Sequence, residues 1–463
     1  MKLGDSFTLD AFLNAADGDT LGVNPTVADR LVSARKVVDA AAASETPVYG
    51  LNTGLGSNLG VPIASSEIAA HQRRIVEGRA TAVGPPLPPG TGRMMLLARL
   101  ISAAKGASGI SPGLFAHLLA LFNDGFDPPV PEFGSIGSSD LTQNAVWALP
   151  ILDAPGAPAL APKDGLILIS HSALTVTLAA RALSQARTSF RALRHAALVS
   201  FTGYHGNPQI FGTAINDLRP APGQAETAAW FRDHLAGTVY QPMRIQDALS
   251  YRTLAPCFGA AEAALTQAIA VWELEANGSS DSPAVIGETL VSTPNFQSPA
   301  LAQALQAATL AMAQLACGSA ERLARLMTAE LSGLPKDLST VGGASAGFVP
   351  AQKTAAALLA QAIATTTPRF EGAPIAHGVE DAAPMTPQAA EDLRRCGDCL
   401  LLIAGLEARA AVQAHQLRQV EVAGPELQSV LLPLLREFKV VTKDRPLGAE
   451  FERMALLLAD GVG

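Results

Sequence analysis

Lys353 is the residue whose sequence surroundings most suggest unusual chemistry. The segment Gly-Phe-Val-Pro-Ala-Gln precedes it and Thr-Ala-Ala-Ala-Leu-Leu follows it, so both flanks are largely apolar. A buried ammonium group needs an acidic partner because burial disfavours its charge, and Glu380 is the candidate. A lysine on a solvated helix face is the alternative, and the sequence leaves both open. A buried Lys353 could stabilise negative charge that accumulates on a substrate.

Two other patterns could carry chemistry. Cys396 and Cys399 form a CxxC motif, which suits a redox pair or half of a zinc site. A second pair is missing and the motif falls in a helical pattern that begins near Pro387, so we expect structural thiols and no metal site. Gly342-Gly343 resembles a phosphate-binding loop, but the Lys-Ser/Thr of such loops does not follow.

The elements that must position these residues are predicted to be helices. The chain has 463 residues, of which 48% are hydrophobic and only 5% aromatic. Ala and Leu dominate, β-branched runs are few, and the apolar spacing is helical over long distances. This pattern predicts an all-α, elongated helical bundle with a core large enough for two or three packed sub-regions.

Charge and hydropathy argue against nucleic acid and membranes as binding partners. The net charge is −8 without a Lys/Arg block, which argues against nucleic acid. The long uncharged stretch 298–320 contains three glutamines and many alanines, so we expect a buried bundle helix and no membrane contact. The first residues lack a basic-then-apolar signal peptide, which predicts a cytoplasmic protein.

Three regions are expected along the chain. Residues 1–181 mix loops and helices, residues 182–420 form a bundle of long helices, and residues 421–463 form a helical tail. The loops would lie at the ends of the bundle, where an active site can be built.

Short motifs spread over nearly the whole chain resemble those of the histidine and phenylalanine ammonia-lyase family. Each motif alone is weak, and their order along the chain is what identifies the resemblance. They include Tyr49-Gly-Leu-Asn-Thr-Gly-Leu-Gly56, Pro131-Glu-Phe-Gly-Ser-Ile-Gly137, Gln246-Asp-Ala-Leu-Ser-Tyr-Arg252, Glu275-Ala-Asn-Gly-Ser-Ser-Asp-Ser-Pro283 and Asp444-Arg-Pro-Leu447.

The resemblance implies a fumarase/aspartase-like fold and a homotetramer whose active sites combine loops from three subunits. It also implies a small amino-acid-derived carboxylate as the substrate. Tyr49 would be the base and Arg252 would grip the carboxylate with two parallel hydrogen bonds. The remaining expected site residues are Gln246, Asn277 and Phe296 for substrate binding, and Glu380 with Lys353 for catalysis.

The family makes its own electrophile, a methylidene-imidazolone (MIO) ring, from an internal Ala-Ser-Gly. Here the matching segment is Gly137-Ser138-Ser139-Asp140-Leu141, one residue shorter, with Asp140 in the place of the attacking glycine. A branched, charged residue fits poorly in so tight a turn. We therefore expect Ser138, Ser139 and Asp140 to be a degenerate site and the protein to carry no MIO cofactor. An upstream triplet, Ala107-Ser108-Gly109, has the flanks of an ordinary helix connection.

Other departures from the family's pattern fall at the same site. Leu249 replaces a second tyrosine, Ser170 replaces an asparagine, and Gln297 replaces a histidine. Arg79 also stands where the family has a histidine. It could bind substrate or form an inter-subunit salt bridge.

Three functions remain open on this basis. The first is a carbon–nitrogen lyase without MIO that eliminates trimethylamine from a histidine betaine, as ergothionase-type relatives do, because a quaternary nitrogen already leaves easily. The second is an ordinary histidine or aromatic ammonia-lyase in which Ser138, Ser139 and Asp140 do cyclise. The third is an inactive relative that serves as a scaffold or binds small carboxylates.

Overall fold

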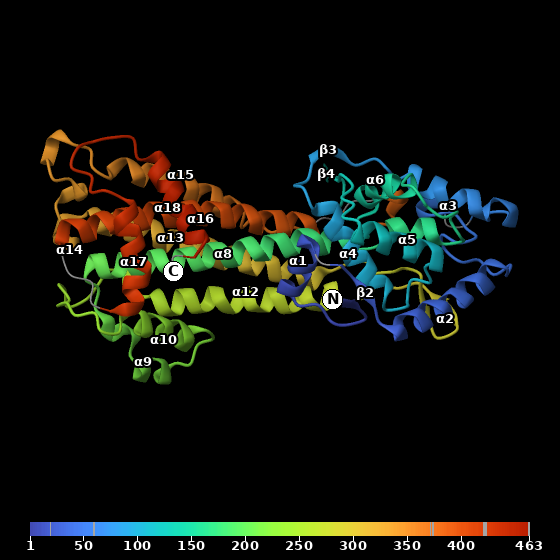
Figure 1. Cartoon of the computed structure of the whole chain (residues 1–463), viewed down its shortest axis with the longest axis horizontal. Coiled ribbons are helices and arrows are strands. Elements are labelled where there is room, and N and C mark those ends of the chain that lie inside the picture. The colour runs from blue at the N-terminus through green and yellow to red at the C-terminus, as the bar shows by residue number, and fades with distance from the viewer. Residues whose placement is uncertain (19, 59–60, 371, 373–374, 420–423, 462–463) are drawn as a thin grey trace. The chain divides into compact units, whose positions relative to one another are not determined.

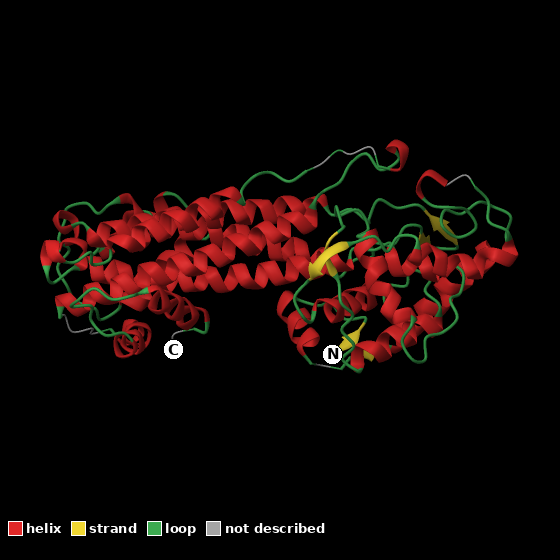
Figure 2. Cartoon of the chain, turned by 90° about the horizontal axis from the view of Figure 1, so that it is seen from above, coloured by secondary structure: helices red, strands yellow, loops and turns green. Residues whose placement is uncertain are grey.

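The protein is predominantly helical. The computed structural model describes residues 1–463 except 19, 59–60, 371, 373–374, 420–423 and 462–463. In this described part, the paired strands form short two-stranded sheets beside many helices (Figure 2). The all-α fold class predicted from the sequence is confirmed.

Contacts divide the chain into two compact units, each assembled from three stretches. Unit 1 comprises Met1–Arg181, Ile269–Ala304 and Pro368–Glu391, and unit 2 comprises Ala182–Ala268, Leu305–Thr367 and Asp392–Gly463. Long helices contribute residues to both units: α8 (Ala173–Tyr204), α12 (Leu254–Ala276), α13 (Pro299–Met327) and α16 (Thr386–Arg418).

Unit 1 consists of shorter helices and small sheets (Figure 1). Strands β1 and β2 pair in parallel, whereas β3 with β4 and β5 with β6 are antiparallel. Its helices are α1 (Leu9–Asp17), α2 (Pro25–Ala42), α3 (Ile68–Glu77), α4 (Thr91–Ala103), α5 (Pro112–Asn123), α6 (Leu141–Leu152) and α7 (Asp164–Ile169). Its strands are β1 (Lys2–Leu3), β2 (Gly22–Val23), β3 (Val83–Pro86), β4 (Pro131–Phe133), β5 (Ala284–Ile286) and β6 (Thr289–Val291).

Helices α3 and α7 approach each other very closely because α7 carries a glycine at the contact. The Gly165 amide donates a hydrogen bond of 3.0 Å to Gln72 Oε1. A Cβ atom at residue 165 would lie 2.1 Å from the Gln72 carbonyl oxygen, which no side chain could tolerate without a shift of backbone. Arg79 follows α3 and Ser170 ends α7, so this contact fixes the spacing of two expected site residues.

Unit 2 is built on the long helices and covered by shorter ones. Arg322 on α13 and Glu407 on α16 form a buried ion pair, with Nε and Oε1 2.6 Å apart. Ser319 Oγ donates to the same carboxylate, so the buried charges are paired and hydrogen-bonded. The shorter helices are α9 (Thr213–Leu218), α10 (Gln224–Leu235), α11 (Leu249–Arg252), α14 (Ala329–Ser332), α15 (Val349–Ala364), α17 (Pro425–Glu437) and α18 (Gly448–Ala459).

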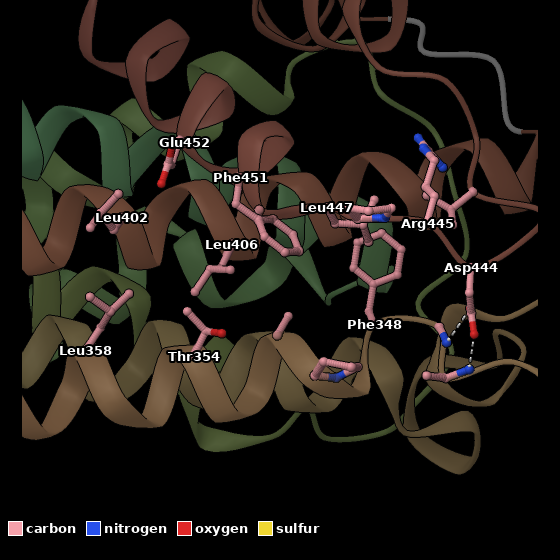
Figure 3. A pocket seen from close by; sticks show the side chains of 17 residues that line it. Phe348, Thr354, Leu358, Leu402, Leu406, Asp444, Arg445, Leu447, Phe451 and Glu452 are labelled. Carbon is pink, nitrogen blue, oxygen red and sulfur yellow. Dashed lines mark hydrogen bonds between the residues drawn. The ribbon is translucent and has the colours of Figure 1, made fainter.

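A cavity of about 650 Å³ lies in unit 2 between α15, α16 and α18. Figure 3 shows Phe348, Leu406 and Phe451 around it, with Asp444 at one end. The Asp444 carboxylate accepts hydrogen bonds from the Ser345 hydroxyl and the Ala346 amide. The site residues expected from the sequence do not line this cavity in the described part of the chain.

Among the residues that the structure describes, three helical stretches are long and apolar enough to cross a membrane by length and composition alone. They are Asp164–Tyr204, Leu254–Ala276 and Pro299–Met327. The most apolar window of the first is 89% buried inside the protein, as expected for a core helix. The corresponding windows of α12 and α13 are only 39% and 50% buried within the single chain.

Candidate functional site

A second cavity, of about 350 Å³, lies entirely within unit 1. It is bounded by the glycine-rich loop 49–56, Arg79 shortly after α3, the loop before α6, the end of α7 and the segments before α13 and α16. Of the site residues expected from the sequence, those that line it are Tyr49, Arg79, Ser138, Ser139, Ser170, Phe296 and Glu380.

The loop before α6 presents two of its residues to the cavity and holds the third away from it. Ser138 and Ser139 line the cavity, whereas Asp140 is almost fully buried behind them. The Asp140 carboxylate accepts hydrogen bonds from the Ser135 hydroxyl and from the amide and hydroxyl of Thr175, at 2.5 to 2.9 Å. Burial raises the pKa of Asp140, and these hydrogen bonds oppose the rise.

The backbone of the same loop is compact. Ser139 and Asp140 have φ angles of 65° and 50°, which is a left-handed backbone conformation that residues other than glycine rarely adopt. Ser139 is held on both sides, because its amide donates to Phe296 O at 3.1 Å and its carbonyl accepts from His171 N at 3.2 Å. Such strain persists only where the surroundings impose it, and it clusters at functional sites.

The Tyr49 side chain reaches the cavity from a tight glycine turn. Gly50 has a φ of +68°, and a Cβ atom there would lie 2.7 Å from Leu55 and Leu166. The Gly56 amide donates to the Tyr49 hydroxyl oxygen at 3.0 Å, which fixes the direction of the phenol. The side chain is 38% exposed, so its hydroxyl remains accessible to a small molecule.

Arg79 and Glu380 bring opposite charges to the cavity. The Arg79 guanidinium is half-buried, and burial lowers its pKa while Tyr49 and Glu380 act to raise it. No ion pair within 4.0 Å joins Arg79 to Glu380 in the described structure. The next residue, Asp381, also lines the cavity and was not anticipated from the sequence.

Ser170 is positioned by the end of α7 and by a buried histidine. Its hydroxyl donates to Ser139 Oγ at 3.2 Å. The neighbouring His171 accepts from the Ala173 amide through Nδ1, which leaves Nε2 to donate to Leu168 O at 3.0 Å. Burial lowers the pKa of His171 to about 3, so this histidine is a neutral structural group.

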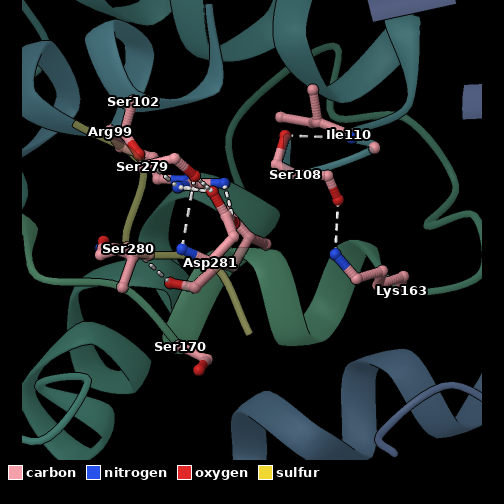
Figure 4. A network of polar contacts seen from close by, with 12 residues as sticks. Arg99, Ser102, Ser108, Ile110, Lys163, Ser170, Ser279, Ser280 and Asp281 are labelled. Carbon is pink, nitrogen blue, oxygen red and sulfur yellow. Dashed lines mark hydrogen bonds and ion pairs between the residues drawn. The ribbon is translucent and has the colours of Figure 1, made fainter. Parts of the chain in front are cut away.

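A buried ionic network supports the same region (Figure 4). Arg99 on α4 pairs with Asp281, with Nη2 and Oδ1 2.8 Å apart, and both side chains are nearly inaccessible. Lys163, which precedes α7, donates to the Ser108 carbonyl, and burial lowers the pKa of this lysine to about 8. Ser108 is therefore part of a structural connection and does not line the cavity.

Comparison with known proteins identifies the family to which the chain belongs. The family model for aromatic amino acid lyases matches residues 7–157 and 152–436. Histidine ammonia-lyases from Stigmatella aurantiaca and Paracidovorax citrulli are 32% and 31% identical, over 99% and 96% of this chain and 96% and 92% of their own. The chain belongs to the aromatic amino acid lyase family.

Solved structures agree with this membership. An ergothionase from Treponema denticola superposes with a TM-score of 0.94 at 24% identity, covering 99% of this chain and 98% of that one. A histidine ammonia-lyase from Trypanosoma cruzi gives 0.89 at 26% identity, covering 100% and 94%. These similarities show that the fold is that of the aromatic amino acid lyases.

Family membership corrects the cofactor expectation. We expected no MIO group, but aromatic amino acid lyases, including the relatives named histidine ammonia-lyase, normally form this group autocatalytically. The described loop fits the position of the ring, since its backbone is compact and the Asp140 carboxylate points away from the cavity. Ser138, Ser139 and Asp140 would supply the ring atoms, and the group would supply an electrophile at the cavity wall.

The remaining expected site residues lie elsewhere. Gln246, Arg252 and Lys353 belong to unit 2, and Arg252 Nη1 donates to Gln246 Oε1 at 3.0 Å on the exposed surface. Lys353 is exposed on α15. Asn277 lies in unit 1, but its side chain forms two hydrogen bonds of 2.8 Å with the backbone of Phe7 and does not line the cavity.

Some lining residues were missed by sequence reasoning. Ser282 lies within a motif that carries the resemblance, so a closer comparison of that motif could have found it. Gln297, noted above as a departure from the family's pattern, also lines the cavity. Ser292 follows the hairpin β5–β6 and has no sequence signal of its own. Gln297 Nε2 donates to Ser138 Oγ at 3.1 Å, which ties it to the same wall of the cavity.

Proposed function

We propose that this aromatic amino acid lyase relative eliminates trimethylamine from an amino-acid-derived betaine, of which a histidine betaine is the best candidate. The observation that carries the proposal is one cavity that combines the phenolic group of Tyr49 with the carboxylates of Glu380 and Asp381. A betaine carries a permanent positive charge, which these carboxylates complement.

In this reaction the phenolate form of Tyr49 takes the β-proton of the substrate and becomes the phenol. The electrons of the broken C–H bond form the double bond between Cα and Cβ, and those of the Cα–N bond leave with the nitrogen as neutral trimethylamine. The hydroxyl is accessible, and the Gly56 amide holds it in one direction, as a positioned general base requires.

Glu380 and Asp381 suit a quaternary nitrogen. Such a nitrogen has no N–H to donate, so it is held by charge and not by directed hydrogen bonds. Neither carboxylate forms an ion pair within the described structure. Their negative charge therefore remains available to the substrate until the nitrogen leaves uncharged.

The serine-rich wall favours a heteroaromatic ring over a plain phenyl ring. Ser138, Ser170 and Ser292 present hydroxyl groups that can both donate and accept, which matches the two nitrogens of an imidazole. A phenyl ring would form no hydrogen bond with these groups and would displace the water that can otherwise bind them, at a cost in binding free energy. Phe296 adds an apolar surface for the ring.

Arg252 holds the substrate's carboxylate, and it comes from another copy of the chain. The resemblance to shared-site lyases supports this assignment, and so does the exposure of Arg252 and Lys353 in unit 2. Gln246 orients the guanidinium and leaves further N–H groups for a bidentate contact. Lys353 of that copy stabilises charge that accumulates on the ring during deprotonation.

The proposal is tested by measuring amine release from the purified protein. Histidine trimethylbetaine, ergothioneine and other betaines are compared with free histidine, phenylalanine and tyrosine, and trimethylamine and ammonia are quantified separately. We expect trimethylamine from at least one betaine and little ammonia. Ammonia from free amino acids, with all betaines inert, would contradict the proposal.

A histidine ammonia-lyase is the second candidate function. The observation that favours it is the 31–32% identity to proteins of that name over nearly the whole chain. It predicts ammonia from free histidine and no trimethylamine from the betaines. The same amine-release assay separates it from the betaine reaction.

A further inference from the structure

The cavity contains one positive charge that the proposed elimination does not use. Among the described residues that line it, Arg79 is the only lysine or arginine. The α-carboxylate of the substrate is already assigned to Arg252, and the quaternary nitrogen to Glu380 and Asp381. A half-buried guanidinium in a substrate cavity therefore needs its own explanation.

Arg79 differs from the other arginines of the same helix region. Arg73 binds Glu77 and Asp153, and Arg74 binds Glu67, all through nitrogen–oxygen distances of 2.7 to 2.8 Å. Arg79 forms only a long hydrogen bond of 3.4 Å from Nη1 to the Ile75 carbonyl within the described structure. A guanidinium has five N–H donors, so most of the donors of this cavity-lining arginine have no hydrogen-bond partner within the described structure.

The surroundings of Arg79 favour an incoming anion. Burial removes water from the guanidinium and lowers its pKa. Tyr49 and Glu380 oppose this lowering of the pKa through electrostatic attraction, without a direct ion pair in the described structure. A desolvated cation gains more from a bonded anion than an exposed one does. The planar fork of an arginine is also suited to a carboxylate, which it binds through two parallel hydrogen bonds.

We propose that Arg79 forms a second anion-binding position, so that the substrate carries an acidic group on its side chain in addition to its α-carboxylate. This rests on the proposed function, in which Arg252 holds the α-carboxylate. The substrate class is thereby narrowed to histidine-type betaines whose ring carries an acidic substituent. Arg79 is a specificity-determining residue in this assignment and takes no part in the transfer of the proton.

Binding of unreactive analogues tests the inference without any turnover. The probes are 3-phenylpropanoate with 3-(4-carboxyphenyl)propanoate, and propanoate with succinate, so each pair differs by one carboxylate. Affinities are measured by titration calorimetry on the full-length protein, its Arg79→Gln and Arg79→Lys variants, and Arg73→Gln as the matched control. The control removes an arginine of α3 that lies outside the cavity.

We expect at least one of the two diacids to bind about tenfold more tightly than the monoacid of its pair, because a charge-assisted hydrogen bond contributes this much binding free energy. Arg79→Gln should remove that preference, Arg79→Lys should keep part of it, and Arg73→Gln should keep all of it. Equal binding of diacid and monoacid by the parent protein would overturn the inference. So would an Arg79→Gln variant that weakens both members of a pair equally, because Arg79 would then hold the common carboxylate.

The two proposals can fail separately. If no betaine releases trimethylamine but the diacid preference depends on Arg79, the proposed elimination is wrong and the second anion site stands. If a betaine releases trimethylamine but the parent protein binds the diacid and the monoacid of each pair equally, the elimination stands and the second anion site is wrong.

Discussion

At the scale of single residues, Tyr49, Arg79 and Glu380 come from three loops far apart in the sequence and meet at one cavity. Sequence reasoning could name them because each lies in or beside a motif of the resemblance. It could not name Ser292, which only the hairpin β5–β6 brings to the wall. The cofactor expectation was wrong because one shortened loop was weighed above the membership of the whole chain.

Tyr49→Phe tests the assignment of the base. We expect turnover to fall by about 10²-fold or more with little change in substrate affinity, since a positioned acid–base group contributes roughly 10²–10⁴-fold to the rate. Steady-state kinetics and ligand titration measure the two effects separately. Tyr240→Phe is the control, because its hydroxyl binds the Gly206 carbonyl in unit 2 and does not line the cavity. A Tyr49→Phe variant with unchanged turnover would assign the proton transfer to another group.

At the scale of elements, apolar periodicity was sufficient to predict helices, because most of the chain follows a helical spacing. It could not predict which helices touch, since that depends on side-chain size at single contacts. Gly165 is such a contact: it lets α7 approach the backbone of α3 and so sets the distance between Ser170 and Arg79. The sequence marks this position only as a glycine between a charged pair and an apolar run.

Gly165→Ala should destabilise the protein by about 1–3 kcal/mol, because the new methyl group would push α3 and α7 apart. Chemical denaturation measures the free energy of unfolding. At permissive temperature we also expect weaker substrate binding, since Arg79 and Ser170 follow these two helices. Gly448→Ala is the matched control, because a Cβ atom there meets nothing within 4 Å. Equal stability of the two variants would show that α3 and α7 can move apart without a loss of folding free energy.

At the scale of the whole molecule, some residues of the proposed active site and parts of the long helices are exposed to solvent in a single chain. Leu249 and Leu274 are 68% and 75% exposed, and the apolar window of α12 is only 39% buried. A long apolar helix that is left this exposed is typical of an interface between proteins. Sequence patterns alone could predict a buried helix here, but not whether the same chain or another copy covers it.

The last prediction is that the protein is a homotetramer whose sites take Tyr49 and Arg252 from different copies. Light scattering should give four copies of the 47.7 kDa chain. Tyr49→Phe and Arg252→Gln should each be nearly inactive alone. When the two variants are unfolded, mixed and reassembled, about a quarter of the sites should regain both native residues, because copies combine at random in a closed symmetric assembly. Each variant reassembled alone is the control. A mixture that stays inactive, although mass spectrometry shows mixed tetramers, would place Tyr49 and Arg252 of one chain in the same site, and a monomer in solution would exclude shared sites altogether.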